Sequence, residues 1–246
     1  MSTEIDGRLR INVRRLLEFF DEKPGESLGQ ATAIVAVAGE DLGVGLLKHC
    51  LECTRNAKVG ILPGPPPTTG NLKGPRLDRW VDVVWPDGSG QLFQTEIKNW
   101  SAHAIGGKIL KVDAPPDEVA RFGRERWRGH AGSMHWNSIS KVLTPMKRPW
   151  DVDPSHTLEP LLIYWWVIHP EGLNESFFPH DLEPGQNFPR LWFFSMSSYL
   201  RSLNEAPVEL EMPHAANRIS WLHSLFLAPP PAGAPPPAGP PDAPRS

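Results

Sequence analysis

Apolar positions recur at helical spacing in two stretches near the start of the chain. The stretch "RLRINVRRLLEFFDE", from Arg8 to Glu22, has apolar side chains every three or four residues. The stretch "GEDLGVGLLKHCLEC" repeats this spacing through Val44, Leu47 and Leu51. A period near 3.6 gathers apolar side chains on one side of a helix. The pattern therefore predicts an amphipathic helix in each stretch.

One acidic residue, Glu40, stands at the head of the second apolar stripe, while Asp41 shares a face with Lys48 and Glu52. We expect Asp41 to be solvated. A carboxylate in the first turn of a helix is favoured by the helix dipole, and this alone explains Glu40.

A β-hairpin is predicted from "RLDRWVDVVWPDGSGQLFQTEIKNW", where two β-rich runs flank a turn of Pro, Asp, Gly and Ser. Pairing Trp85 with Gln91 around a five-residue loop places Asp78 opposite Lys98. Side chains alternate between the two faces of a strand, so even-numbered residues share one face.

That face carries three carboxylates and one ammonium group, namely Asp78, Asp82, Glu96 and Lys98. Like charges repel at close range, so such a group is costly to assemble unless a cation joins it. Oxygen-rich sites suit Mg²⁺ or Mn²⁺. The competing interpretation is a solvated sheet face with cross-strand pairs such as Asp78 with Lys98.

The remaining elements predict an α/β protein. A helix is indicated by "PPDEVARFGRERWRGH", with acids in its first turn. The run from Leu161 to Ile168 is apolar throughout, which is typical of a strand covered on both faces. A further strand from Arg190 to Met196 leads into a short helix, "SSYLRSL".

This arrangement resembles the PD-(D/E)xK nuclease superfamily between Glu40 and Ile168. The resemblance rests on an acid in one strand, a turn and Glu-x-Lys ending the next strand, with a glutamate-bearing helix before them and a helix and a buried strand after them. It implies a restriction-endonuclease-like core (αβββαβ), a mixed central sheet flanked by helices. It also implies a nuclease that depends on Mg²⁺ or Mn²⁺ and hydrolyses phosphodiester bonds, with DNA as the favoured substrate, in bacterial defence or nucleic-acid processing.

The resemblance also assigns the site. Its metal-binding acids fall on Asp78 or Asp82 and on Glu96, its lysine on Lys98, its first-helix acid on Glu40 and an accessory glutamine on Gln94. The lead-in "GPRLD" favours Asp78, whereas the distance to the glutamate favours Asp82, so both remain candidates. The alternative function is a catalytically inactive subunit of this fold that binds nucleic acid or a protein partner.

A basic stripe is predicted on the helix after Asp117, where Arg121, Arg124 and Arg128 follow at helical spacing. Such a stripe makes sequence-independent phosphate contacts in nucleic-acid-binding proteins. A solvated helix face is the plain alternative.

Composition limits these interpretations. The chain has 246 residues, 40% of them hydrophobic and 22% charged, and a net charge of −3, which indicates a globular protein without a global preference for polyanions.

We expect one domain over residues 1–228, with its core at about 31–200. The stretch 61–75 is expected to be a linker or loop. No run is apolar enough for a membrane span, and "MSTEIDGRLR" is no signal peptide, so a cytoplasmic protein is expected.

Two short motifs remain. The last 18 residues, 229–246, contain nine prolines and predict a disordered tail. A plain solvated terminus is the favoured interpretation, and a ligand for proline-reading partners is the alternative. The only two cysteines, Cys50 and Cys53, follow His49 as C-x-x-C. Without a second Cys/His pair, two small buried thiols on one helix face are a simpler interpretation than zinc, and a redox motif is the alternative.

Overall fold

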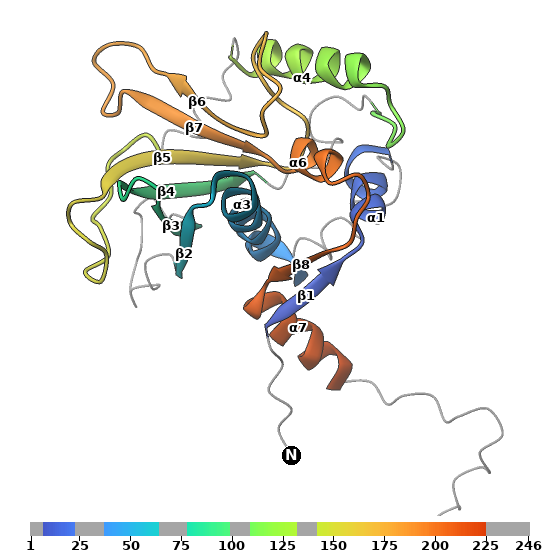
Figure 1. Ribbon diagram of the computed structural model, residues 1–246, viewed down its shortest axis with the longest axis horizontal. Coiled ribbons are helices and arrows are strands. Elements are labelled where there is room, and N and C mark those ends of the chain that lie inside the picture. Colours follow the sequence, from blue (N-terminus) through green and yellow to red (C-terminus); the bar gives the residue numbers. More distant parts are fainter. Residues whose placement is uncertain (1–6, 23–36, 64–77, 99–108, 132–141, 225–246) are drawn as a thin grey trace, which may run out of the picture.

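A six-stranded mixed sheet forms the centre of the protein (Figure 1). The computed structural model describes residues 7–22, 37–63, 78–98, 109–131 and 142–224. The elements are β1 (Arg8–Ile11), α1 (Val13–Leu17), the π-helix η1 (Glu18–Glu22), α3 (Gly39–Arg55), β2 (Lys58–Pro63), β3 (Arg79–Val84), β4 (Gly90–Lys98), α4 (Pro116–Ala131), β5 (Thr157–Tyr164), β6 (Phe177–Asp181), β7 (Arg190–Ser195), α6 (Met196–Ser202), β8 (Val208–Glu211) and α7 (Pro213–Ser224).

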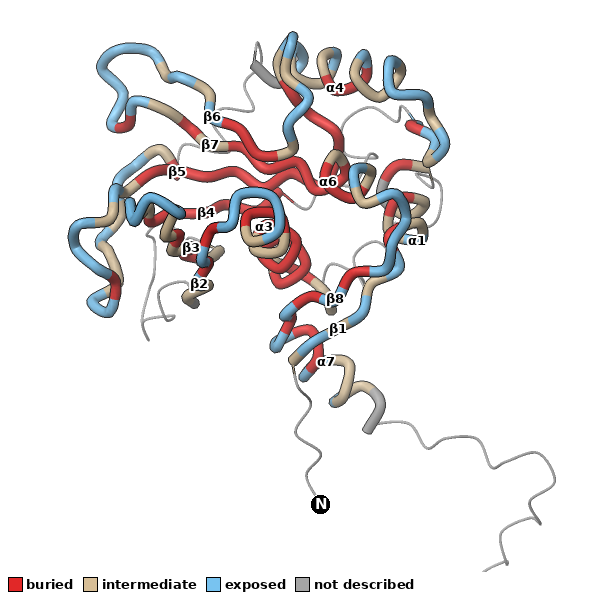
Figure 2. The backbone as a smooth tube through the Cα atoms, in the orientation of Figure 1, coloured by how far each residue is buried: buried red, intermediate tan, exposed pale blue. Residues whose placement is uncertain are grey.

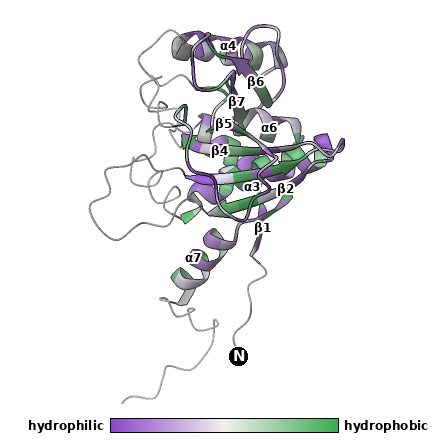
Figure 3. Cartoon of the chain, turned by 90° about the vertical axis from the view of Figure 1, so that its left-hand side faces the viewer, coloured by the Kyte–Doolittle hydropathy of each residue, from purple (hydrophilic) through white to green (hydrophobic). Residues whose placement is uncertain are grey.

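The large sheet has the order β2-β3-β4-β5-β7-β6. Strand β3 runs antiparallel to both β2 and β4, β5 runs parallel to β4 and β7, and β6 returns antiparallel to β7. Hydrophobic residues gather in the central strands (Figure 3), and β4 and β5 are buried along most of their length (Figure 2). The predicted α/β class, with a mixed sheet flanked by helices, is confirmed.

Helices cover both faces of this sheet. On one face α3 packs through Leu46, Leu47 and Leu51 into a core that includes Phe93 and Ile163. On the other face Trp127 of α4 lies against Phe178 and Phe193, with ring centroids 5.9 and 5.1 Å away. The helices predicted from Glu40 to Cys53 and after Asp117 are therefore confirmed, and each covers one face of the sheet.

The first predicted helix is only partly correct. Residues Arg8–Ile11 form β1, which pairs antiparallel with β8, and the helix begins after Asn12. The Asn12 side chain accepts a hydrogen bond from the Arg15 backbone N at 3.0 Å. An asparagine cap of this kind marks a helix start, and it separates the alternating "RLRI" from the helical pattern that follows.

The predicted hairpin forms, but its register differs from the expected one by two residues. Trp85 N donates to Ser89 O at 2.9 Å, which leaves a loop of only Pro86, Asp87 and Gly88. Gly88 has φ 84° and closes the turn, and Asp87 accepts from Ser89 N at 2.9 Å. An even shift keeps every side chain on its expected face but changes the opposite partner.

Two further boundaries differ from the sequence-based expectation. The stretch expected to be a linker from Ile61 begins inside β2, which continues to Pro63, and residues 64–75 lie outside the described part. The strand predicted up to Ile168 ends at Tyr164, although Trp165 to Ile168 remain buried. Residues 229–246 also lie outside the described part, so the tail and the single-domain boundary stay predictions.

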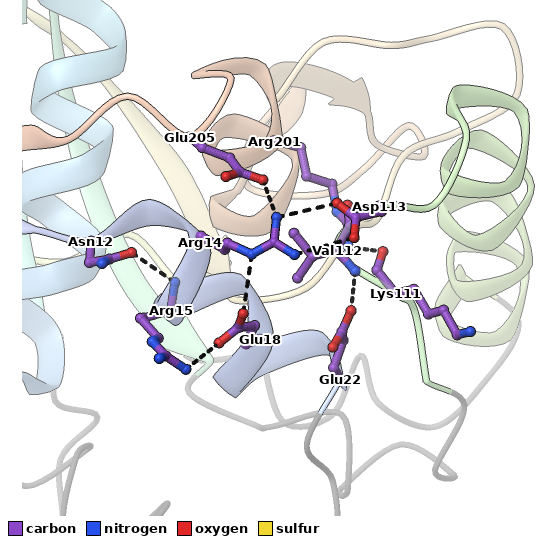
Figure 4. A network of polar contacts seen from close by, with 10 residues as sticks. All are labelled: Asn12, Arg14, Arg15, Glu18, Glu22, Lys111, Val112, Asp113, Arg201 and Glu205. Atoms are coloured by element: carbon purple, nitrogen blue, oxygen red, sulfur yellow. Dashed lines mark hydrogen bonds and ion pairs between the residues drawn. The ribbon is translucent and has the colours of Figure 1, made fainter.

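A polar network fixes the segment that leads into α4 (Figure 4). Arg14 of α1 donates to Glu205 at 2.6 Å and to Asp113 at 3.2 and 3.3 Å. Arg201 of α6 donates to Val112 O at 2.9 Å and to the buried Asp21 at 2.8 Å. These contacts tie the segment before α4 to α1, η1 and α6.

Candidate functional site

Asp78 lies directly before β3 and is held against β4. Its backbone N donates to Thr95 O at 3.2 Å, and its carboxylate accepts from Ile97 N at 2.6 Å. These two partners flank Glu96 in the chain. The antiparallel pairing of β3 with β4 therefore brings the Asp78 carboxylate beside Glu96.

The electrostatics of Asp78 are unusual for a carboxyl group. Burial, followed by the negative charge of Glu96, raises the pKa of Asp78 to about 6. The hydrogen bond from Ile97 N and the charge of Lys98 oppose this shift, and Glu40 adds to it. Burial and like charges both disfavour the ionised carboxylate, so this is a position where a cation would be stabilised.

Glu96 and Lys98 form an ion pair inside the protein. Lys98 Nζ donates to Glu96 Oε1 at 2.6 Å, and the two residues are 7% and 8% exposed. Their β5 neighbours in register are Leu162 and Tyr164, both buried. Charged side chains are rarely this buried, and they remain so only when paired. The Glu-x-Lys motif is thus not an ordinary solvated strand surface.

Glu40, in the first turn of α3, approaches this group but is engaged by a cation. Arg79, the residue after Asp78, bonds the Glu40 carboxylate and also reaches Asp41 at 3.4 Å. Arg79 was not among the predicted site residues. The only sequence feature that points to Arg79 is its position directly after Asp78, a candidate metal-binding acid.

The expectation that Asp41 is solvated is wrong. Asp41 is 3% exposed, and besides Arg79 it accepts from Ala215 N of α7 at 2.9 Å. Helical spacing placed it on a polar face, but α7 and β3 cover that face. Asp41 therefore joins α3 to α7.

Asp82 lies elsewhere on the hairpin. In the observed register it pairs with Leu92, four residues before Glu96, which corresponds to about 13 Å along a strand. His156 Nδ1 donates to its carboxylate at 2.6 Å. Of the two candidate aspartates, the structure brings Asp78 to Glu96 and places Asp82 apart. No sequence signal pointed to His156, which is 74 positions away.

Gln94, expected as an accessory residue, is completely buried and holds a segment of backbone. Its amide nitrogen donates to Val142 O and to Thr144 O, the latter at 3.0 Å, and its oxygen accepts from Met146 N at 3.1 Å. These bonds use both ends of the amide. They define Gln94 as the anchor of residues 142–146 beside β4.

The basic stripe on α4 is exposed at its two ends. The side chains of Arg121 and Arg128 are 65% and 67% exposed, and Arg124 is half-buried. Glu118 lies 4.0 Å from Arg121, and Glu171 lies 3.3 Å from Arg128. These exposed ion pairs are weak and leave the arginines accessible to another anion.

The C-x-x-C pair is split between two environments. Cys50 is buried, as expected, whereas Cys53 is exposed, and both are free thiols. The prediction of two buried thiols is therefore wrong for Cys53, because α3 turns that position outward in its last turn.

Three further observations concern metal-binding groups, cavities and membrane-spanning helices. Within the described ranges, no three His, Cys, Asp or Glu side chains gather closely enough to share a metal ion. A cavity of about 680 Å³ lies between α4 and α6, and none of the candidate acids lines it. No helix in the described part combines the length and apolar character needed to cross a bilayer.

Comparison of the chain with known protein families, with curated proteins and with solved structures finds no match. The geometry of Asp78, Glu96 and Lys98 is therefore the main indication of what this protein does.

Proposed function

We propose that this protein is a metal-dependent nuclease that hydrolyses phosphodiester bonds, with DNA as the first substrate to test. The observation that carries the proposal is the crowding of two carboxylates, Asp78 and Glu96, next to the ammonium group of Lys98. Burial and the charge of Glu96 raise the pKa of Asp78 to about 6. A folded protein keeps such unfavourable electrostatics most often where they serve a function.

The arrangement of the chain supports the resemblance to PD-(D/E)xK nucleases. From α3 to β5 the order is helix, three strands, helix and strand, as that resemblance implies. The Glu-x-Lys motif ends β4, and Asp78 comes at the start of β3. The residues of the proposed site thus follow the order of the motif.

The residues present fit a Mg²⁺ or Mn²⁺ ion. Mg²⁺ is commonly bound by only one or two carboxylates, with waters and substrate phosphates as its other ligands. Asp78 and Glu96 would supply these carboxylates, and a cation between them would remove their mutual repulsion. When bound, such an ion lowers the pKa of water and neutralises charge on a phosphodiester.

The other charged groups have distinct roles in this proposal. Lys98 brings three N–H donors beside Glu96, where they would hold a phosphate oxygen or position the attacking water. Glu40 is held by Arg79, so it acts on the site through its negative charge.

A second candidate function is a nuclease-fold subunit without catalytic activity, which binds nucleic acid or a protein partner. One observation favours it, namely that Glu96 and Glu40 already have cationic partners in Lys98 and Arg79. Ion affinity separates the two functions, because a binding subunit has no need to hold a divalent cation.

Calorimetric titration of Mn²⁺, beside a plasmid-cleavage assay, tests the proposal. We expect wild type to bind the ion and cut the plasmid, and Glu96→Gln to lose both properties. Asp82→Asn is the matched control, since this carboxylate lies on the same hairpin but is bonded to His156. It should bind the ion and cut like wild type. Absence of ion binding at millimolar Mn²⁺, or full activity of Glu96→Gln, would refute the nuclease proposal.

Nucleic-acid binding is tested separately on α4. Replacing Arg121, Arg124 and Arg128 by Gln should weaken DNA binding to a similar extent for all sequences. It should also reduce the slope of log K against log salt by up to about three. A triple Gln variant with an unchanged slope would show that this helix face does not contact phosphates.

A further inference from the structure

A second group of reactive side chains lies at the C-terminal end of α3, and the proposed nuclease site does not use it. Cys53 Sγ lies 3.7 Å from His49 Nε2, one helical turn before it. His49 Nδ1 lies 2.6 Å from the hydroxyl of Tyr199 on α6. A thiol, an imidazole and a phenol therefore form a continuous hydrogen-bonded chain.

The position of Tyr199 is fixed by packing. This residue is 2% exposed, and its ring lies 5.9 Å from the rings of both His49 and Phe194. Burial raises the pKa of Tyr199 well above its ordinary value, so the phenol stays neutral. Its oxygen can then accept a hydrogen bond from His49 Nδ1, which leaves Nε2 free to accept the thiol proton of Cys53.

The two cysteines of the chain differ in their access to solvent. Cys50 is 3% exposed, and burial raises the pKa of its thiol. Cys53 is exposed. Because the thiolate is the nucleophile, the buried thiol is expected to be inert and the exposed one open to reagents.

We propose that Cys53 is a reactive thiol that forms mixed disulfides with small disulfide molecules, with His49 as its base and Tyr199 as the residue that positions His49. The proton of Cys53 passes to His49 Nε2, and Sγ forms a bond to one sulfur of the incoming disulfide. The original S–S bond breaks. Its second sulfur leaves as a thiolate, which takes the proton from His49, so the incoming disulfide is the only oxidant.

The surroundings make the histidine necessary. The C-terminal end of a helix carries a partial negative charge that disfavours a thiolate in the last turn. The nearby charges form opposing pairs among themselves, namely Lys48 with Glu52 and Glu211, and Arg55 with Glu175. Burial lowers the pKa of His49, with Glu52 opposing the shift, so the imidazole is neutral and can accept a proton near pH 7.

A small hollow lies beside His49, and the exposed Cys53 is not among the residues that line it. A hollow of about 180 Å³ next to the imidazole is lined by both basic and acidic side chains, including Arg8, Lys48 and Glu209. This volume is below the range of about 300–1,000 Å³ that is usual for drug-sized ligands. The charged side chains around His49 therefore favour a small disulfide that carries charged groups of its own.

The test follows the reaction of the folded full chain with 5,5′-dithiobis-(2-nitrobenzoate) between pH 6 and 9. The variant Cys50→Ala keeps Cys53 as its only thiol, because the chain has two cysteines. We expect one fast-reacting thiol in this variant and in wild type, and none in Cys53→Ser. Adding His49→Gln to Cys50→Ala should slow the reaction at pH 7 by about three- to tenfold, since a lower thiolate fraction is partly offset by higher nucleophilicity.

The pH profile separates a positioning role from a structural one. When added to Cys50→Ala, His49→Gln and Tyr199→Phe should each move the pH midpoint of the rate upward, because the base that accepts the thiol proton is removed or loses its partner. Glu52→Gln is the matched control that alters a neighbouring charge but keeps the chain of three groups, and it should leave the midpoint at or below that of Cys50→Ala. Circular dichroism confirms folding of each variant. If His49→Gln and Tyr199→Phe both keep the parent rate and midpoint, the proposal is wrong.

Discussion

Asp78 and Asp82 stand four positions apart on one arm of the hairpin, and the tertiary structure surrounds their carboxylates differently. Asp82 accepts a bond from His156 at 2.6 Å, and its side chain is 26% exposed. Asp78 accepts a bond from the backbone N of Ile97 and faces the negative charge of Glu96. One carboxylate is stabilised by a basic partner, whereas the other is destabilised by an acidic neighbour. The Asp82 carboxylate, with its basic partner, contributes to the stability of the fold. The Asp78 carboxylate, beside another negative charge, is stabilised by binding a cation or a proton.

The largest expected effect concerns Lys98, on the Asp78 side of this comparison. Lys98→Ala should lower the rate of DNA cleavage by about 10²–10³, because one preorganised electrostatic contact with the reacting phosphate is lost. Its affinity for Mn²⁺ should stay equal or rise, because a positive charge beside Glu96 is removed. Plasmid cleavage and calorimetry on the same preparation measure the two effects. A parallel loss of ion binding would mean that Lys98 serves the fold of the site instead.

The two aspartates should respond with opposite signs when each is made neutral. The pKa of Asp78 rises to about 6 on folding because of burial and the charge of Glu96, from about 3.9 in an unfolded chain. The folded state therefore holds a proton that the unfolded state releases, and the free energy of unfolding falls by about 2–3 kcal/mol as the pH rises from 4 to 6. Asp78→Asn should remove this loss and be more stable than wild type at pH 7, by about 2 kcal/mol.

Asp82→Asn should instead be less stable than wild type at pH 7, since it breaks the pair with His156. Urea denaturation of both variants at pH 5 and pH 7 measures the difference. Two variants that lose stability equally would contradict the contrast between these carboxylates.

The smallest expected effect concerns the partner of Asp82. His156→Gln should cost about 1 kcal/mol of stability, because the ion pair is partly exposed. It should cut DNA like wild type, since His156 lies at the end of the hairpin away from Glu96. Denaturation and cleavage assays with Gly90→Ala give an independent check. A methyl group there would lie 2.0 Å from the His156 ring and displace it.

The sequence predicted the alternation of side chains in the hairpin but not what lies opposite each one. Asp78 and Asp82 have the same parity and similar neighbours in the chain, so no local pattern separates them. Their difference comes from a loop of three residues in place of five and from His156, which is 74 positions away. Apolar periodicity predicted α3, and the prolines and acids at its start predicted α4.

Long-range pairing explains the elements that were missed. Strand β1 was expected to be helical, and its partner β8 was not predicted, since four-residue strands carry little pattern of their own. Asp41 looked solvated for a similar reason, because its partners come from β3 and α7. A single sequence gives no information about such contacts.

The pairing of β1 with β8 also bears on how the chain folds. Arg8 lies opposite Glu211, so nearly all of the described chain forms one loop between these two strands. The entropy needed to close a loop grows slowly with length, as about (3/2)RT ln n, but it must be supplied before the contact stabilises anything. We expect this small sheet to form late in folding and to open early in unfolding, after the hairpin that carries Asp78 and Glu96 is already in place. Joining the ends of the chain and opening it elsewhere would make this contact local and speed its formation.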